Sequence, residues 1–479
     1  MDSTHLARLL PLLPELIVGG GAAALLMAGV FRSGGLGRAV DYAAIAVLAV
    51  AGGALLLLPE GTLVGFNGSF VLDDFARFLK MLALLGSAAA ILLSLDYAER
   101  ERQYRFETSV LILLSTLGML MLISAADLIA LYLGLELMSL PLYVIAASHR
   151  DNLRSTEAGL KYFVLGALSS GMLLYGASLT YGFTGTVSFA GIAHAAGQGG
   201  ANIGLIFGIV FLFAGFCFKV SAVPFHMWTP DVYEGAPTPV TAFFAAAPKV
   251  AGIAMFVRAA IMAFPGVTGE WQQILVFVAI ASMALGAFAA IGQRNIKRLM
   301  AYSSIGHMGF ALIGLAAGTS EGVQGVLIYI AIYVTMTLGV FAVILSMRRD
   351  TGMVESIDQL AGLARTHPAT AFFMAMLLFS MAGIPPLAGF FAKFYVFLAA
   401  IKAGLYVLAV IGVLASVIGA YYYLAIIKIM YFDEPAENFY AMPYELRIVL
   451  AVCGLFNILF FLYPGPLVGI ASAAAHSLF

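Results

Sequence analysis

Charged residues are scarce in this sequence. Of its 479 residues only 10% are Asp, Glu, Lys or Arg, whereas 62% are hydrophobic. A soluble domain carries roughly 25% charged residues, so a soluble fold is excluded. At about 20 apolar residues per crossing, the apolar content predicts a polytopic membrane protein with little chain left for an extramembrane domain.

The sequence also lacks an excess of charge, cysteine motifs and nucleotide-binding motifs. The formal net charge is −1 and no basic run is present, which excludes nucleic acid as a partner. The two cysteines, Cys217 and Cys453, lie far apart in apolar stretches and favour small core residues over a disulfide or metal site. No iron–sulfur spacing, haem-type histidine pair or phosphate-binding loop occurs. We therefore expect no cofactor, metal or ATP site in this chain, and its energy must come from an ion gradient or a partner.

Apolar windows separated by charge, Gly or Pro predict about fourteen transmembrane helices. Only helices or closed barrels satisfy the backbone within lipid, and windows this long and uniformly apolar are helical. The first window is expected to be a retained span rather than a signal peptide, because no small-residue cleavage pattern follows it. The predicted fold class is therefore an all-α polytopic membrane protein.

The predicted loops alternate in basic charge, which is the usual signal for orientation. One set is basic and comprises Arg32, Arg38, Arg100, Arg102, Arg105, Arg150, Arg154, Arg294, Lys297, Arg298, Arg348, Arg349, Arg365 and Arg447. The other set is nearly bare of basic residues and offers Asp73, Asp74, Asp127, Glu270, Glu321 and Lys402. We expect the basic loops to be cytoplasmic and both termini periplasmic, in a cell inner membrane. The connection after His226 is an exception, because it falls on the basic side without Lys or Arg.

Four ionisable residues fall near the middle of predicted spans. They are Glu136, Lys219, Lys249 and Lys393. Each costs roughly 2.5–3.5 kcal/mol at the bilayer centre, so a functional role is the default hypothesis and a structural ion pair is the alternative. Four further lysines lie nearer span ends, where a side chain that reaches the headgroups is favoured. These are Lys80, Lys161, Lys402 and Lys428.

A proline accompanies each of the four mid-span charges. These prolines are Pro141, Pro224, Pro248 and the pair Pro385 and Pro386. Proline frees a backbone carbonyl, and freed backbone at membrane depth is tolerated only against protein or water. The pattern predicts helix breaks near residues 219–226 and 383–388, with an ordinary proline kink as the alternative at any one helix. A titratable group beside a hydrated break suits proton transfer, and His226 and His307 are candidate relays.

Two stretches resemble each other in outline, residues 107–264 and residues 272–431. Each is predicted to hold five spans with a break in the fourth, and an odd number of spans makes the second copy inverted. Inverted repeats with broken helices are typical of transporters and build half-channels that open to opposite sides. Residues 1–105 then form three N-terminal helices and residues 440–479 a C-terminal helix, all within one membrane domain. Coincidence between two apolar stretches remains the alternative.

The longest specific motif runs from Lys219-Val-Ser-Ala-Val-Pro-Phe-His-Met-Trp-Thr-Pro-Asp to Ala247-Pro-Lys249. Together with Gly134-Leu-Glu136-Leu-Met-Ser, Arg294-Asn-Ile-Lys-Arg-Leu-Met-Ala-Tyr302 and the Pro385 to Lys393 segment, it resembles subunit N of the proton-pumping NADH:quinone oxidoreductase, respiratory complex I. The resemblance covers essentially the whole chain.

This resemblance implies an antiporter-like, proton-translocating subunit of a hydrophobic arm, packed among other membrane-arm subunits. Flavin, iron–sulfur clusters and quinone would then reside in partner subunits, and the chain would belong to an enzyme only as part of the translocase. The resemblance also assigns residue roles, as follows: Glu136 and Lys219 match the family's charge pair, Lys249 its connecting lysine and Lys393 the lysine of the exit half-channel, with Lys161 and Tyr302 as further relay candidates.

Two other classes of function remain open at this point. A multi-subunit sodium/proton antiporter shares this fold, but a sodium site favours converging carboxylate and carbonyl oxygens. The central residues here are mostly lysine, which suits protons better. A membrane scaffold without transport is disfavoured because mid-span charges are costly to retain without use.

Overall fold

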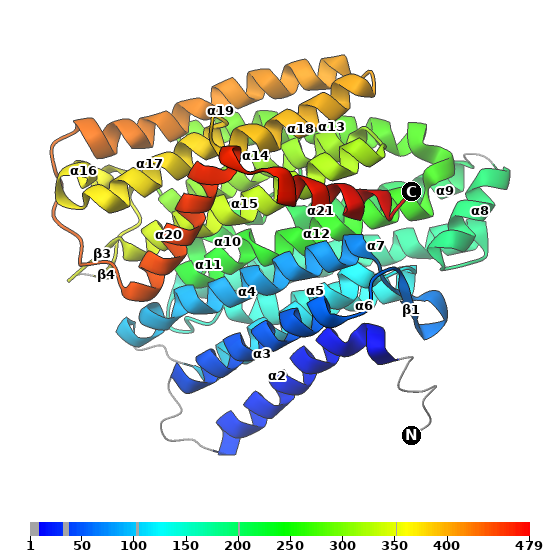
Figure 1. The fold of residues 1–479 in the computed structure, drawn as a ribbon, viewed down its shortest axis with the longest axis horizontal. Helices are drawn as coiled ribbons and strands as arrows, with labels where there is room; N and C mark the ends of the chain where they lie inside the picture. The colour runs from blue at the N-terminus through cyan, green and yellow to red at the C-terminus, as the bar shows by residue number, and fades with distance from the viewer. Residues whose placement is uncertain (1–8, 32–37, 102–104, 200–201, 351) are drawn as a thin grey trace.

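The computed structural model describes residues 9–31, 38–101, 105–199, 202–350 and 352–479 (Figure 1). Arg32 and Arg102 of the predicted basic loops lie outside these residues. The helices are α2 (Leu13–Phe31), α3 (Arg38–Leu57), α4 (Asp74–Arg100), α5 (Phe106–Ser124), α6 (Leu128–Ala146), α7 (Leu153–Thr184), α8 (Phe189–Gly199), α9 (Ile203–Val220), α10 (Thr229–Gly235), α11 (Thr238–Ala245), α12 (Ala247–Arg258), α13 (Thr268–Ile291), α14 (Ile296–Ala316), α15 (Ser320–Ser346), α16 (Leu363–Thr366), α17 (Pro368–Ala382), α18 (Ala388–Lys402), α19 (Tyr406–Phe432), α20 (Tyr444–Leu459) and α21 (Gly465–His476). The strands are β1 (Leu63–Gly65), β2 (Phe70–Leu72), β3 (Arg348–Arg349) and β4 (Gly352–Met353).

The long helices lie side by side and run between two ends of the molecule (Figure 1). Among the described residues, 13 helices are long and apolar enough to cross a membrane. The shorter helices α17 and α18 follow one another across the bundle and make a further, interrupted crossing (Figure 1). In the described part of the chain, strands form two antiparallel hairpins, β1 with β2 and β3 with β4, at opposite ends. The predicted all-α polytopic membrane fold is confirmed.

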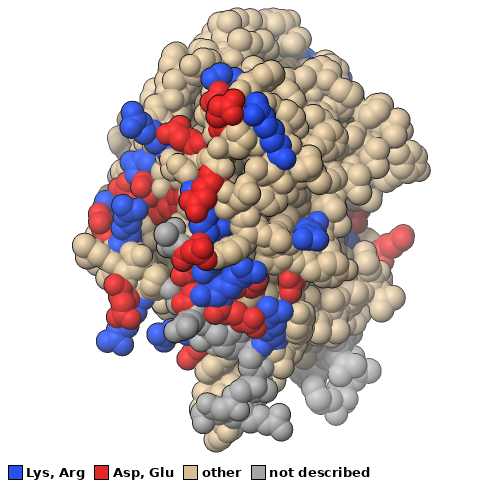
Figure 2. All heavy atoms as spheres, turned by 90° about the vertical axis from the view of Figure 1, so that its left-hand side faces the viewer, with Lys and Arg blue, Asp and Glu red and all other residues tan. Residues whose placement is uncertain are grey.

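Charged side chains gather at the end of the bundle that holds β3, β4 and α16, which we call the charged end. Figure 2 views this end directly and shows basic and acidic side chains interspersed over it. Ion pairs here join Arg348 to Glu101 at 2.8 Å and Arg365 to Glu434 at 3.2 Å. The basic loops predicted from the sequence therefore contribute to one face of the molecule, as charges that must stay in water require.

The connection after His226, which breaks the basic pattern, has a structural explanation. Its helix α10 supplies acids instead of bases. Asp231 accepts from Lys161 Nζ of α7 at 2.8 Å and from Arg298 Nη1 of α14 at 2.7 Å. Glu234 accepts from the same Arg298 nitrogen at 3.0 Å. The bases of neighbouring helices thus take the place of a Lys or Arg within the connection.

Both predicted helix breaks are present and are capped in the same way. α9 ends at Val220, and Ser221 adopts a φ of 62°, with the amide of Ala222 donating to the carbonyl of Cys217 at 2.8 Å. α17 ends at Ala382, and Gly383 adopts a φ of 89°, with the amide of Ile384 donating to the carbonyl of Phe379 at 3.1 Å. A left-handed residue after the last turn lets the chain satisfy the carbonyls that the break would leave free.

The other two prolines differ from each other. α11 and α12 are separate helices on either side of Ala246, so the chain is also broken just before Pro248. α6, however, runs without interruption through Pro141. The sequence predicts breaks only near residues 219–226 and 383–388, and at Pro141 the alternative of a proline within a helix holds.

The core of the bundle lies around α12, α14 and α15. Every residue of α12 is buried, including both of its bases, Lys249 and Arg258. Small residues allow close approach elsewhere in the bundle: a Cβ on Gly286 of α13 would lie 2.6 Å from the amide nitrogen of Gly306 on α14. Among the candidate spans, those of α12, α14 and α15 are the most completely enclosed by protein, and the first two carry Lys249 and His307.

Candidate functional site

Lys219 lies at the end of α9 and is solvated by hydroxyl groups. Its Nζ donates to Ser139 Oγ at 2.8 Å and to Tyr143 Oη at 3.0 Å, both on α6. The ammonium also lies 5.2 Å from the centre of the Tyr143 ring. Only 6% of Lys219 is exposed. Among the described residues, the groups that accept hydrogen bonds from this ammonium are therefore neutral.

Glu136 lies on α6, one turn before Ser139, and is half-buried. Ser170 Oγ of α7 donates to its Oε1, and Tyr132 Oη lies 3.4 Å from the same serine oxygen. Although both residues are described, no ion pair joins Glu136 to Lys219. The two groups expected to form a charge pair are instead held by different serines. The link between them in this structure is α6, which carries Glu136 as well as the two hydroxyls that bind Lys219.

Lys249 lies in the first turn of α12 and donates to Ser221 Oγ, the capping residue of the first break. Thr229 Oγ1 donates to the same oxygen at 2.6 Å, and the Trp228 ring centre lies 5.4 Å from the ammonium. The start of a helix is an unfavourable place for a cation, because the helix dipole is positive there. Lys249 thus contacts Ser221, two residues after Lys219, so the two lysines lie on either side of one break.

Lys393 lies on α18, after the second break. Its Nζ donates to the Ala382 carbonyl at 2.9 Å and to Ser416 Oγ of α19 at 2.7 Å. The Ala382 carbonyl is the last of α17, so this lysine uses backbone that the break exposes. Phe310 covers the ammonium, with 4.7 Å between the charge and the ring centre. Only 7% of Lys393 is exposed.

His307 of α14 is buried close to Lys393. Its Nδ1 lies 2.6 Å from Tyr329 Oη of α15, and its Nε2 lies 3.1 Å from Tyr423 Oη of α19. The Tyr423 hydroxyl is in turn 2.5 Å from Ser303 Oγ. A cavity of about 10 Å³ is lined by His307, Lys393 and Ser416 among others, which is close to the space one water molecule needs. His307 is thus hydrogen-bonded at both nitrogens beside a lysine.

We call Lys219, Lys249, Lys393 and His307 the buried line, and the remaining relay candidates are more exposed than these four residues. Lys161 is 41% exposed and pairs with Glu157 and Asp231 at the charged end. Burial alone would raise the pKa of Asp231, but hydrogen bonds from Lys161 and Arg298 hold that pKa below its usual value. His226 is half-buried in the first break, and its Nδ1 has no hydrogen-bond partner among the residues that the structure describes. Tyr302 is half-buried and lies one turn after Arg298 on α14.

Two buried ion pairs escaped the sequence analysis. Lys80 of α4 is fully buried and donates to Glu15 of α2 at 2.6 Å, so the expectation that it reaches the headgroups is wrong. Asp73 binds Arg258 of α12 through both oxygens, at 2.7 and 2.9 Å. The sequence shows each of these charged residues within or beside an apolar window. The two members of a pair, however, are 65 residues apart for Lys80 and Glu15 and 185 residues apart for Arg258 and Asp73. Local pattern cannot identify such a partner.

Comparison with known proteins identifies the family of this chain. The profile of the family described as NADH:quinone oxidoreductase/Mrp antiporter, transmembrane, matches residues 125–419, a range that holds Glu136, all three central lysines and His307. The NADH-quinone oxidoreductase subunit N of Parvibaculum lavamentivorans is 64% identical over 98% of this chain and 97% of its own length. The chain belongs to the subunit N family.

Solved structures agree with this family. A chain of respiratory complex I from Thermus thermophilus with bound aureothin is 33% identical, covers 96% of this chain and 99% of its own length, and has a TM-score of 0.82. A chain of the Mrp complex from Dietzia sp. DQ12-45-1b has a TM-score of 0.87 over 99% of this chain and 97% of its own, at 22% identity. The second likeness concerns the fold alone.

Among the described residues, no group of three or more His, Cys, Asp or Glu side chains could hold a metal ion.

Proposed function

We propose that Lys219, Lys249 and Lys393 carry protons through the bundle, with Glu136 as the carboxylate that changes the charge balance at Lys219. One observation supports this most strongly. Within the described residues, each of the three lysines is buried and none forms an ion pair, whereas the buried bases Lys80, Arg258 and Lys297 each contact a carboxylate. A buried, unpaired lysine can be neutral in one state and protonated in another.

The chain is an antiporter-like membrane subunit of respiratory complex I, and its partners are other subunits of that complex. It contributes to the translocase rather than to electron transfer. Flavin, iron–sulfur clusters and quinone are expected in partner subunits, whose NADH-to-quinone reaction would drive the movement of charge near Glu136.

The orientation and the repeat form part of the same proposal. Since the predicted basic loops contribute to the charged end, that end would face the cytoplasm and both termini the periplasm of a cell inner membrane. Residues 107–264 and 272–431 would be inverted copies, each with a broken fourth crossing. α5 and α13, which open the two copies, begin at opposite ends of the bundle, as inversion requires (Figure 1). His226, His307, Lys161 and Tyr302 would relay protons at the ends of these half-channels or between them.

Substitution of Glu136 and Lys219 in the whole complex tests the proposal. Glu136→Gln and Lys219→Ala should each reduce proton pumping and coupled NADH:quinone turnover in membrane vesicles, while the complex still assembles. Lys402→Ala is the matched control, because Lys402 is an exposed lysine at the end of α18. Normal pumping by both variants would overturn the site assignment. Transport that requires Na⁺ would instead indicate the sodium/proton antiporter class.

A further inference from the structure

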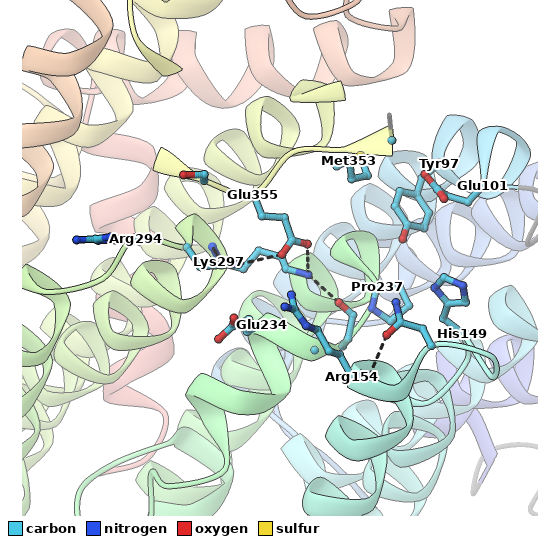
Figure 3. A pocket seen from close by; sticks show the side chains of 16 residues that line it. Tyr97, Glu101, His149, Arg154, Glu234, Pro237, Arg294, Lys297, Met353 and Glu355 are labelled. Atoms are coloured by element: carbon cyan, nitrogen blue, oxygen red, sulfur yellow. Dashed lines mark hydrogen bonds and ion pairs between the residues drawn. The ribbon is translucent and has the colours of Figure 1, made fainter. Parts of the chain in front are cut away.

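A large polar cavity lies at the charged end. Its volume is about 630 Å³, enough for many water molecules, and we call it the vestibule. Figure 3 shows its wall, which is built from the end of α4, the connection before α7, the link between α10 and α11, and the segments next to α14 and β4. Charges of both signs face it, including Arg154, Glu234, Arg294 and Glu355. It is separate from the buried line of lysines described above.

Lys297 closes the inner side of the vestibule. It is almost fully buried, whereas its partner Glu355 is about one-quarter exposed. Lys297 Nζ lies 2.6 Å from Glu355 Oε1 and donates to the Ala236 carbonyl at 3.0 Å (Figure 3). Asn295 Nδ2 donates to the second oxygen of Glu355 at 2.9 Å, which fixes the carboxylate. The ammonium is thus held between the link from α10 to α11 on one side and the segment after β4 on the other.

Behind Lys297, the same face of α14 leads to the buried line. Ser304 lies two turns after Lys297, and His307 lies one turn further, so all three share a face. Ser304 Oγ is 2.8 Å from Tyr333 Oη. Between Lys297 and Ser304 this face carries Met300 and Ala301, which are buried and apolar. About two helical turns of α14 therefore separate Lys297 from Ser304, the next polar side chain on this face.

We propose that Lys297, held by Glu355 and the Ala236 carbonyl, seals His307 and Lys393, the exit side of the buried line, against water and protons from the vestibule. Two positive features coincide at this point, the ammonium and the start of α14, and a fixed positive charge of this kind repels protons. The seal rests on the proposed function in one respect: an exit half-channel that delivers protons through Lys393 to the opposite end would be short-circuited by free access from the charged end. Lys297 is then a barrier residue, not a proton carrier.

The test measures leak without turnover, in purified complex reconstituted into liposomes. With no NADH present, an imposed pH gradient should decay several-fold faster with Lys297→Met than with the wild type. Lys297→Arg, which keeps the cation, should restore the slow decay. Arg294→Met is the matched control, because it removes a cation from the vestibule wall three residues away and leaves the inner side closed. Wild-type decay with Lys297→Met would overturn the seal, whatever the outcome for Lys219.

Thiol accessibility gives an independent reading. Ala301→Cys, with the buried Cys217 and Cys453 replaced by alanine, places a thiol behind Lys297. A membrane-impermeant thiol reagent at the charged end should leave it unmodified when Lys297 is present and modify it in Lys297→Met. If Lys297→Met does not assemble, Glu355→Ala takes its place, since it removes the ion pair that holds the ammonium. Equal modification with and without the intact pair would contradict the proposal.

Discussion

The buried bases of this protein fall into two groups that differ in their partners. In the first group each base contacts a carboxylate; its members are Lys80 with Glu15 at 2.6 Å, Arg258 with Asp73 at 2.7 Å and Lys297 with Glu355 at 2.6 Å. In the second group the partners are hydroxyls and one backbone carbonyl; its members are Lys219, Lys249 and Lys393.

The difference separates structural charges from mobile ones. A base that is paired with a carboxylate in a low-dielectric interior stays charged, because losing its proton would strand the carboxylate. A base held by neutral oxygens can exchange its proton without leaving such a partner. The first group thus fixes helices to one another, and the second group is suited to transport. The following predictions test this distinction, from the largest expected effect to the smallest.

Removing one partner of a paired base should be the most damaging change. Asp73→Ala leaves the Arg258 guanidinium buried without its carboxylate, which should cost about 3–5 kcal/mol of folding stability. We expect much less assembled complex and a lower melting temperature in detergent. Asp74→Ala, at the exposed neighbouring position, is the control and should behave like the wild type. If Asp73→Ala assembled normally, Arg258 could not be counted among the structural charges.

The second break should be sensitive to a single methyl group. At Gly383, with a φ of 89°, an added Cβ would lie 2.9 Å from Lys393 Cδ. Gly404 has a φ of 78° with open space around it. Alanine at either position should cost about 1–2 kcal/mol in backbone strain, but only Gly383→Ala should also displace Lys393 and reduce proton pumping. Similar pumping by the two variants would argue against a role for the position of Lys393.

The two breaks should respond differently to the loss of a hydroxyl. Ser221→Ala removes the hydrogen-bond acceptor of Lys249, whereas Ser416→Ala leaves Lys393 bound to the Ala382 carbonyl. A hydrogen bond to a charged group is worth about 1.5–3 kcal/mol, so Ser221→Ala should reduce coupled turnover more strongly. Turnover assays on membrane vesicles, normalised to assembled complex, make the comparison. The reverse order would show that the backbone carbonyl contributes little at Lys393.

The smallest effect concerns the ion pairs at the charged end. Because the pKa of Asp231 is held below its usual value, its pairs with Lys161 and Arg298 stabilise the fold above that usual value, and this contribution is lost as the pH falls through the lowered pKa. Asp231 is about one-third exposed, so the contribution is about 1 kcal/mol or less. Asp231→Asn should lower the melting temperature slightly near pH 7, and the difference from wild type should shrink towards pH 3. A constant difference would mean that the charge of Asp231 is not responsible.

Local sequence features predicted the helices and the breaks well. The length of an apolar window is enough to predict a transmembrane helix. The left-handed residues Ser221 and Gly383 lie within three residues of the prolines from which the breaks were predicted. Pro141 shows the limit, since α6 continues through it, and a proline alone does not break a helix that its neighbours support.

Partners that depend on tertiary packing could not be predicted. Lys80 lies in an apolar window, and only the fold brings Glu15 of α2 against it. The sequence predicted Glu136 and Lys219 as a charge pair, but no periodicity reveals that Ser170 and Ser139 are the hydroxyls that hold them in this structure. Asp231 of α10 likewise forms ion pairs with Lys161 of α7 and Arg298 of α14, which the sequence alone does not identify as its partners.

The central claim is that unpaired buried lysines carry the protons, and Lys249 tests it most directly. The measurement is the number of protons pumped per NADH oxidised by the purified complex in liposomes, with Lys249→Met compared with Lys402→Met. Because Lys249 has no carboxylate partner among the described residues, its removal should leave the complex assembled. The account predicts fewer protons per NADH, or loss of coupled turnover, for Lys249→Met and a wild-type ratio for Lys402→Met. A wild-type ratio at normal turnover in both variants would contradict it.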